Sequence, residues 1–312
     1  MSHSRCRVTS MSLTKAPTDH QTEPEAGQNH HPVADTNPSD EPAQLSTLSP
    51  SRAGDFKTCP QLFKFRAIDR LEEPTSIYQA RGTAAHLALE RLFDLDAEDR
   101  TAEHLYDLFR QAWTELRTEE EYAGLFDGIE AERLWGVESL NVLANYFALE
   151  DPTSITAFDR ELDMLETLGD MTIRGILDRV DETTDGDLII TDYKTGKAPP
   201  ERYALSAFFA LKIYALLIRT RLGRTPTELR LLYLGNATMY RVNVDDAQLD
   251  AMRRQLQALW KAINRALERQ HFPPKPGPLC NWCSFQDRCP AFVSEADPEQ
   301  PAITNSPAAN SR

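Results

Sequence analysis

Gly175-Ile176-Leu177-Asp178-Arg179-Val180-Asp181, followed after a polar turn by Ile190-Thr191-Asp192-Tyr193-Lys194-Thr195-Gly196, decides the fold of this chain. Both stretches are rich in apolar residues, β-branched ones among them, as β-strands are. Residues 182–186 between them have the composition of a turn. The sequence therefore predicts a β-hairpin.

The hairpin brings charged side chains together on one face. Side chains alternate across a strand, so Asp192 and Lys194 point the same way. A turn symmetric about Thr184 sets Ile190 opposite Asp178 and makes the two aspartates diagonal cross-strand neighbours. Both carboxylates would then reach one ion.

Two carboxylates without obligatory nitrogen or sulfur ligands suit Mg²⁺ or Mn²⁺, which prefer oxygen and keep positions for water and phosphate. Lys194 would position an attacking water and offset charge developing on the phosphate. The alternative is structural. In that interpretation Asp178 and Asp192 are ordinary strand-end carboxylates paired with Arg179 and Lys194.

The surrounding segments predict a mixed α/β core. Alternating apolar residues predict strands at 155–165, 171–181, 187–194, 228–234 and 238–244. Helical spacing predicts helices at 80–93, 203–221 and 246–270, with a further helix start at Ser49. Helical spacing also recurs over 96–150, which indicates a helical insertion of about residues 94–150.

The two ends of the chain are poor in large apolar residues. We expect disordered tails at 1–45 and 292–312 and one folded domain at 46–291. The first tail lacks the apolar stretch of a signal peptide, and no segment is expected to be long and apolar enough to span a membrane. A cytoplasmic location is therefore predicted.

Net charge is −14, which argues against a nucleic-acid partner when taken alone. The acidity is unevenly distributed: residues 93–151 hold 16 acidic against 4 basic residues, and residues 152–290 hold 18 against 19. Acidity is therefore concentrated in the helical insertion and the tails, which leaves Arg and Lys elsewhere available for phosphates.

The chain has five cysteines: Cys6, Cys59, Cys280, Cys283 and Cys289. Grouped cysteines in a reducing compartment indicate a metal more often than a disulfide. One distant cysteine with a Cys-x2-Cys-x5-Cys cluster differs from the paired Cys-x2-Cys knuckles usual for structural zinc, although Zn²⁺ remains an alternative.

The two stretches of the hairpin closely resemble the nuclease motif of the RecB-like branch of the PD-(D/E)xK superfamily. The resemblance implies a restriction-endonuclease-like mixed β-sheet core flanked by helices. It also implies that Asp178 and Asp192 bind the catalytic metal and that Lys194 is catalytic.

Two further motifs of that branch occur in the expected order. The run from Arg81 to His86 resembles its glycine-then-histidine helix, which implies that His86 joins the metal; a helical histidine is otherwise usually structural. Tyr214 matches the tyrosine of its glutamine-x-x-x-tyrosine motif and would be catalytic, or else part of the core. The glutamine position is Ala210, a departure that puts a substrate-orienting contact from this helix in question.

The cysteine arrangement resembles the [4Fe-4S] staple of AddB-type and CRISPR-associated members of the branch, so Cys59, Cys280, Cys283 and Cys289 are expected to hold an iron–sulfur cluster. We refer to these four residues as the cysteine set. Closing so long a loop suggests an upper-bound stabilisation of about 5 kcal/mol, so the cluster is expected to be structural.

The resemblance implies a DNA exonuclease of repair or recombination that acts on single strands or ends. A catalytically silent nucleic-acid-binding or scaffold subunit is the first alternative, and a nuclease acting on RNA or in a CRISPR or mobile-element setting is the second. The chain has no Gly-x4-Gly-Lys-Ser/Thr motif, so any unwinding would come from a separate helicase.

Overall fold

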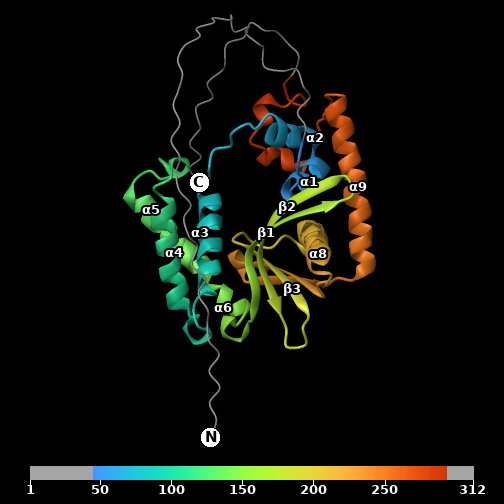
Figure 1. Cartoon of the computed structure of the whole chain (residues 1–312). Helices are drawn as coiled ribbons and strands as arrows, with labels where there is room; N and C mark the ends of the chain where they lie inside the picture. Colours follow the sequence, from blue (N-terminus) through green and yellow to red (C-terminus); the bar gives the residue numbers. More distant parts are fainter. Residues whose placement is uncertain (1–44, 294–312) are drawn as a thin grey trace, which may run out of the picture. The chain divides into compact units, whose positions relative to one another are not determined.

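Figure 1 presents the computed structural model, which describes residues 45–293. The tails predicted at 1–45 and 292–312 lie outside the described residues except for Leu45, Phe292 and Val293. The strands are β1 (Ala157–Leu168), β2 (Met171–Glu182), β3 (Leu188–Lys194), β4 (Glu228–Tyr233) and β5 (Thr238–Asn243). The α-helices of the described part are α1 (Pro50–Thr58), α2 (Pro60–Phe63), α3 (Ile77–Leu92), α4 (Ala102–Leu116), α5 (Ile129–Ala144), α6 (Tyr146–Leu149), α7 (Glu201–Ala207), α8 (Phe209–Leu222) and α9 (Asp246–Glu268).

Several helices begin and end at residues suited to those positions. Ser49 caps α1, with Pro50 as its first residue, and Ser76 forms a capping box with Gln79 at the start of α3. Gly223 ends α8 in the left-handed region, at φ 66°, where a side chain would be strained. Local sequence thus sets these boundaries.

The strands of the described region form one mixed sheet in the order β1-β2-β3-β4-β5. Strand β2 pairs antiparallel with both β1 and β3, and β4 pairs antiparallel with β5. Strands β3 and β4 are parallel and are joined through α7 and α8. The predicted mixed α/β core is therefore confirmed.

The hairpin register differs from the predicted one. Ile190 pairs with Val180 and not with Asp178, because the turn is centred on Asp185. Thr183 and Asp187 close the turn, and Gly186 follows Asp185 with a φ of 84°. The shift of two residues keeps the alternation unchanged, so the two aspartates still share a face.

Each face of the sheet is covered by its own hydrophobic core. On one face Ile190 and Leu231 pack with apolar residues of α1, α8 and α9. On the other, Tyr193 and Leu232 pack with residues of α3, α4 and α5. In Figure 1, α3 to α5 lie on one side of the strands and α8 and α9 on the other. The central strand β3 is thereby buried on both sides.

The predicted helix over 203–221 is two helices, α7 and α8, which meet at the buried residue Phe208. The expectation that no segment is long and apolar enough to span a membrane also fails as stated. Residues 201–222 are long and apolar enough by length and composition alone, because an 18-residue window within them has a mean hydropathy of 1.4. In the structure the apolar residues of α8, including Leu211 and Ile213, lie in the core beside the sheet.

The helical insertion holds α4, α5 and α6, but its limits and those of the domain remain predictions. We expect a chain of residues 46–291 to be soluble and to melt with one cooperative transition within a few degrees of the full chain. The reason is that the hydrophobic cores described above lie inside these limits. Scanning calorimetry of both chains tests this, and an insoluble truncated chain contradicts the limits.

Candidate active site

The β1–β2 ladder opens at one point, where Glu161 faces Asp178. Pairs Arg160–Arg179 and Leu162–Leu177 flank this point, but Glu161 and Asp178 are not paired. Glu161 has a φ of 42°, which is unusual for a residue with a side chain. The β2–β3 ladder also stops at Arg179. Both strands therefore leave regular pairing where the acidic residues gather.

The Asp178 carboxylate replaces the missing ladder bond. Its Oδ2 accepts the backbone N–H of Tyr193 at 2.7 Å. Its Oδ1 lies 3.4 Å from Nδ1 of His86. Asp178 thus holds β3 with one oxygen and faces α3 with the other.

His86 is oriented by a backbone bond. Its Nε2 lies 3.1 Å from the carbonyl oxygen of Tyr193, which can only accept, so Nε2 donates. Nδ1 is left to face Asp178, since a hydrogen bond from the other ring nitrogen fixes the orientation of a metal-binding histidine in this way. Burial lowers the pKa of His86, but the Asp178 carboxylate outweighs it and raises the pKa to about 9.

Glu161 completes a group that the sequence did not indicate. In the described part of the chain, one set of ligand atoms lies within 4.8 Å of one another, that of His86, Glu161 and Asp178. We call these three residues the ligand group. Burial, and then the Asp178 carboxylate, raise the pKa of Glu161 to about 7. A cleft of about 730 Å³ opens beside it, with His86 and Glu161 in its wall.

Asp192 and Lys194 lie on the next strand. Oδ2 of Asp192 is buried and forms an ion pair with Nζ of Lys194 at 2.5 Å. Burial and the Asp178 carboxylate raise the pKa of Asp192 to about 6, against the effect of Lys194. Burial lowers the pKa of Lys194, but the Asp192 carboxylate raises it overall.

Tyr214 approaches the carboxylates from α8. Burial raises its pKa, followed by the negative charges of Asp192 and Asp178, so the phenol is near the site. A side chain at Gly175 would lie 2.5 Å from the Tyr214 ring, so glycine is needed there. Ala210, one turn earlier on α8, supplies no polar group.

The structural alternative for Asp178 fails on geometry. Arg179 points to the opposite face and forms ion pairs with Glu150 and Asp181, and not with Asp178. For Asp192, the predicted ion pair with Lys194 is present. Asp178 is therefore not a strand-end carboxylate neutralised by its neighbour.

The chemistry of these residues fits a divalent cation that prefers oxygen ligands. The ligand group offers two carboxylates and one imidazole nitrogen, and Asp192 adds a buried carboxylate oxygen next to Lys194. Such a donor set, close to an ammonium group and an open cleft, suits Mg²⁺ or Mn²⁺.

The cysteine set gathers elsewhere, around a cavity of about 320 Å³ that all four residues line. The four thiols are free. Backbone N–H groups of Lys275 and Gly277 donate to the sulfurs of Cys59 and Cys280 at 3.4 and 3.3 Å. Within residues 45–293 the four sulfurs do not approach one another as closely as the ligand group does.

We expect His86→Ala and Glu161→Gln each to weaken Mn²⁺ binding by about tenfold or more. Losing a residue that only orients a metal ligand typically weakens metal binding by that factor, so losing a direct ligand should weaken it at least as much. Glu90→Gln is the matched control, because Glu90 lines the same cleft outside the ligand group. Isothermal titration gives the affinities. An unchanged affinity in either variant removes that residue from the ligand group.

Metal binding should also depend on pH. The pKa values of His86, Glu161 and Asp192 are raised to about 9, 7 and 6. Protons therefore compete with the cation at neutral pH, and raising the pH removes them. We expect Mn²⁺ affinity to rise between pH 6 and pH 8 with net proton release, measured by titration in buffers of different ionisation enthalpy. A pH-independent affinity contradicts this assignment.

Comparison with known proteins shows the family of the chain. Residues 47–290 match the family model of the PD-(D/E)XK nuclease superfamily, and the chain belongs to this superfamily. Its mixed five-stranded sheet flanked by helices is the predicted restriction-endonuclease-like core.

Individual relatives are distant. The chain is 24% identical over 278 residues to the Gene 69 protein of Mycobacterium phage D29, which covers 80% of this chain and 98% of that protein. Among solved structures, it is similar to a candidate exonuclease of Eubacterium rectale, with a TM-score of 0.48 and 13% identity over 85% of this chain and 91% of that one. It is also similar to SSO0001, with a TM-score of 0.40 and 15% identity over 81% and 89%.

Proposed function

We propose that this protein is a divalent-metal-dependent DNA nuclease that hydrolyses phosphodiester bonds from strand ends, as an exonuclease does. One observation carries the proposal. The ligand group converges within 4.8 Å beside the buried Asp192 carboxylate, whose Oδ2 is paired with Lys194. In a member of a nuclease superfamily, an anionic cluster of this kind next to a lysine supports phosphodiester hydrolysis.

The site residues have two roles, metal binding and water positioning, which follow from their chemistry. Asp178, Asp192, Glu161 and His86 would hold Mg²⁺ or Mn²⁺, which when bound supplies Lewis-acid stabilisation of the phosphate and a lowered pKa for water. Lys194 keeps its proton, because its pKa is raised by Asp192. Its half-exposed ammonium can orient an attacking water and offset charge on the phosphate.

A polyanionic substrate needs an approach that avoids the acidic insertion. There the four arginines, Arg100, Arg110, Arg117 and Arg133, already bond to carboxylates or carbonyls. By contrast, Arg254 and Lys261 on α9 and Arg269 just after it are exposed and have no carboxylate partner within residues 45–293. This contrast supports DNA binding outside the insertion.

The finer assignment rests on the resemblance to the RecB-like branch. It supports action on single-stranded DNA or ends in repair or recombination, with unwinding by a separate helicase. The silent-subunit alternative is disfavoured, since a protein without catalysis has no need of an intact Asp178, Asp192 and Lys194.

A cleavage assay on labelled DNA tests the proposal. Single- and double-stranded DNA labelled at either end, closed circular DNA and single-stranded RNA are incubated with Mg²⁺ or Mn²⁺. We expect linear DNA to be degraded from its ends while circles persist, and Lys194→Ala protein to be inactive. Internal cuts would indicate an endonuclease, and faster RNA cleavage an RNA nuclease. Binding without cleavage of any substrate would support the silent subunit.

We further propose that the cysteine set holds a structural [4Fe-4S] cluster. All four cysteines line one cavity, and N–H groups directed at sulfur are typical neighbours of such clusters. Tetrahedral Zn²⁺ with Zn–S distances of about 2.3 Å needs sulfurs about 3.8 Å apart. Zn²⁺ bound by the four thiolates is the alternative.

A small apolar cluster surrounds this cavity. Phe65 and Phe285, whose ring centroids are 5.2 Å apart, pack with Cys289 separately from the two larger cores. So few apolar contacts contribute little stability where the N-terminal and C-terminal cysteines meet. This supports stabilisation by a bound metal centre. Free thiols and such a cluster fit the reducing cytoplasm expected above.

A further inference from the structure

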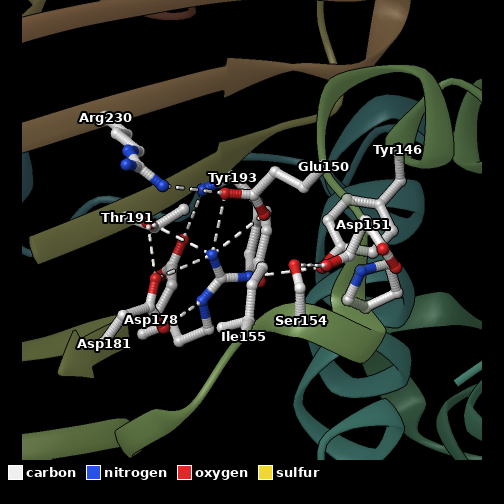
Figure 2. A network of polar contacts seen from close by, with 12 residues as sticks. Tyr146, Glu150, Asp151, Ser154, Ile155, Asp178, Asp181, Thr191, Tyr193 and Arg230 are labelled. Atoms are coloured by element: carbon white, nitrogen blue, oxygen red, sulfur yellow. Dashed lines mark hydrogen bonds and ion pairs between the residues drawn. The ribbon is translucent and has the colours of Figure 1, made fainter. Parts of the chain in front are cut away.

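Arg179, the residue after Asp178, is the largest fully buried side chain of the described region and is 1% exposed. Its guanidinium lies 2.9 Å from both carboxylate oxygens of Glu150 and within 3.0 Å of both oxygens of Asp181. It also donates to the Tyr193 hydroxyl. Figure 2 shows Glu150 and Asp181 reaching toward the centre of this network from different elements. A buried cation has here a full set of partners.

Glu150 joins two parts of the molecule. It follows α6 directly, at the end of the helical insertion, and its side chain is 4% exposed. Arg179 and Asp181 belong to β2, and Arg230 of β4 lies 3.6 Å from Glu150. Arg230 also pairs with Glu228, so two cations face three carboxylates, and the insertion is bonded to the centre of the sheet.

Tyr193 connects this network to the ligand group. Its hydroxyl accepts from Arg179, while its backbone N–H donates to Asp178 at 2.7 Å and its carbonyl accepts from His86 at 3.1 Å. The ring is enclosed by Tyr146 and His86, with centroids 6.0 and 6.1 Å away. One residue therefore fixes two members of the ligand group with its backbone and is itself held by its side chain.

We propose that Glu150 and Arg179 are positioning residues, which hold Tyr193 and through it Asp178 and His86 in the geometry that binds the cation. The helical insertion then supports the metal site through Glu150, although it contributes no residue to the ligand group. This inference rests on the proposed function, because it assigns the ligand group to a catalytic cation.

The competing interpretation is that the network only stabilises the fold. Removing one partner of a buried ion pair destabilises a protein whatever its role, so a lower melting temperature does not distinguish the two. Metal affinity does distinguish them, because a purely structural pair leaves the affinity of the folded protein unchanged.

Three variants separate these interpretations. Glu150→Gln removes the charge and keeps the shape, and Tyr193→Phe removes only the hydroxyl link. The matched control is Glu166→Gln, which breaks another inter-element Arg–Glu pair, Arg221–Glu166 at 2.7 Å, remote from the ligand group. Mn²⁺ affinity by isothermal titration, melting temperature and cleavage at varied Mn²⁺ are measured for each, and for the Glu150→Gln, Tyr193→Phe double variant.

We expect Glu150→Gln and Tyr193→Phe each to weaken Mn²⁺ binding about tenfold, which is the usual effect of losing a residue that orients a metal ligand. The double variant should be little weaker than either, because both act through one link. The control should bind Mn²⁺ like the parent.

Parental affinity in both single variants, with only melting lowered, overturns the inference, as does an additive double variant. If Glu150→Gln does not fold, Tyr193→Phe alone decides between these outcomes. A parent that binds Mn²⁺ but leaves DNA intact overturns the proposed function only, since positioning is measured from metal binding.

Discussion

Asp178→Asn, Asp192→Asn and Lys194→Ala are each expected to abolish DNA cleavage without unfolding the protein. The two asparagine variants remove a metal-binding charge, and the alanine variant removes the ammonium beside the phosphate. Loss of one preorganised electrostatic contact costs about a hundredfold or more in rate. End-labelled DNA and a fixed Mn²⁺ concentration provide the measurement.

Asp192→Asn has a second expected effect that separates function from stability. Burial and Asp178 raise the pKa of Asp192 to about 6, so above that pH its charge destabilises the metal-free fold. At pH 8 we therefore expect the metal-free variant to melt no lower than the parent.

Asp163→Asn is the matched control, since Asp163 lies on β1 as an exposed carboxylate paired with Arg174. It should cleave like the parent. Full activity in any of the three site variants would remove that residue from the mechanism.

Cys59→Ser is expected to bleach the protein and to lower its stability. Iron–sulfur clusters absorb in the visible, and parental protein purified without oxygen should be brown, with about four irons per chain. Because Cys59 is the one ligand from the N-terminal side, its loss opens the connection to Cys280. The free energy of unfolding should fall by up to about 5 kcal/mol.

Cys6→Ser is the control for this experiment, because Cys6 is the one cysteine outside the cysteine set. That variant should keep its colour, its iron and its stability. Colourless parental protein with stoichiometric zinc would contradict the cluster and leave the chemistry of the ligand group untouched.

The sequence was informative wherever a local pattern determined the structure. Each predicted strand is present within a few residues, since alternation and turn composition are local properties. The hairpin register was wrong by two residues because Asp185, and not Thr184, is the centre of the turn. The error left Asp178 and Asp192 on one face, because an even shift preserves alternation.

Glu161 was missed because nothing in its own strand distinguishes it from the acidic residues nearby. The signal lay in the preceding turn. Gly169 and Asp170 join β1 to β2, and Leu168 pairs with Met171. Counting back along both strands from that turn sets Glu161 opposite Asp178, so treating these strands as a second hairpin would have found it.

The buried network was beyond sequence reasoning for another reason. Arg179 was interpreted as a possible partner of Asp178 because the two are adjacent, yet adjacent residues of a strand face opposite ways. Its actual partner Glu150 comes from the insertion, and only the tertiary fold brings them together. The break at Phe208 likewise depends on packing and not on helical periodicity.

The wide separation of Cys59 from Cys280 has a consequence for biosynthesis. About 220 residues lie between them, and ribosomes add roughly 5–20 residues per second. The first thiol thus emerges about 10 to 40 seconds before its partners, and must stay reduced and unoccupied during that time. Any centre bound by all four cysteines is completed only after Cys289 has left the ribosome. The yield of finished protein in an expression host should therefore follow its capacity to load metal after translation more closely than its rate of translation.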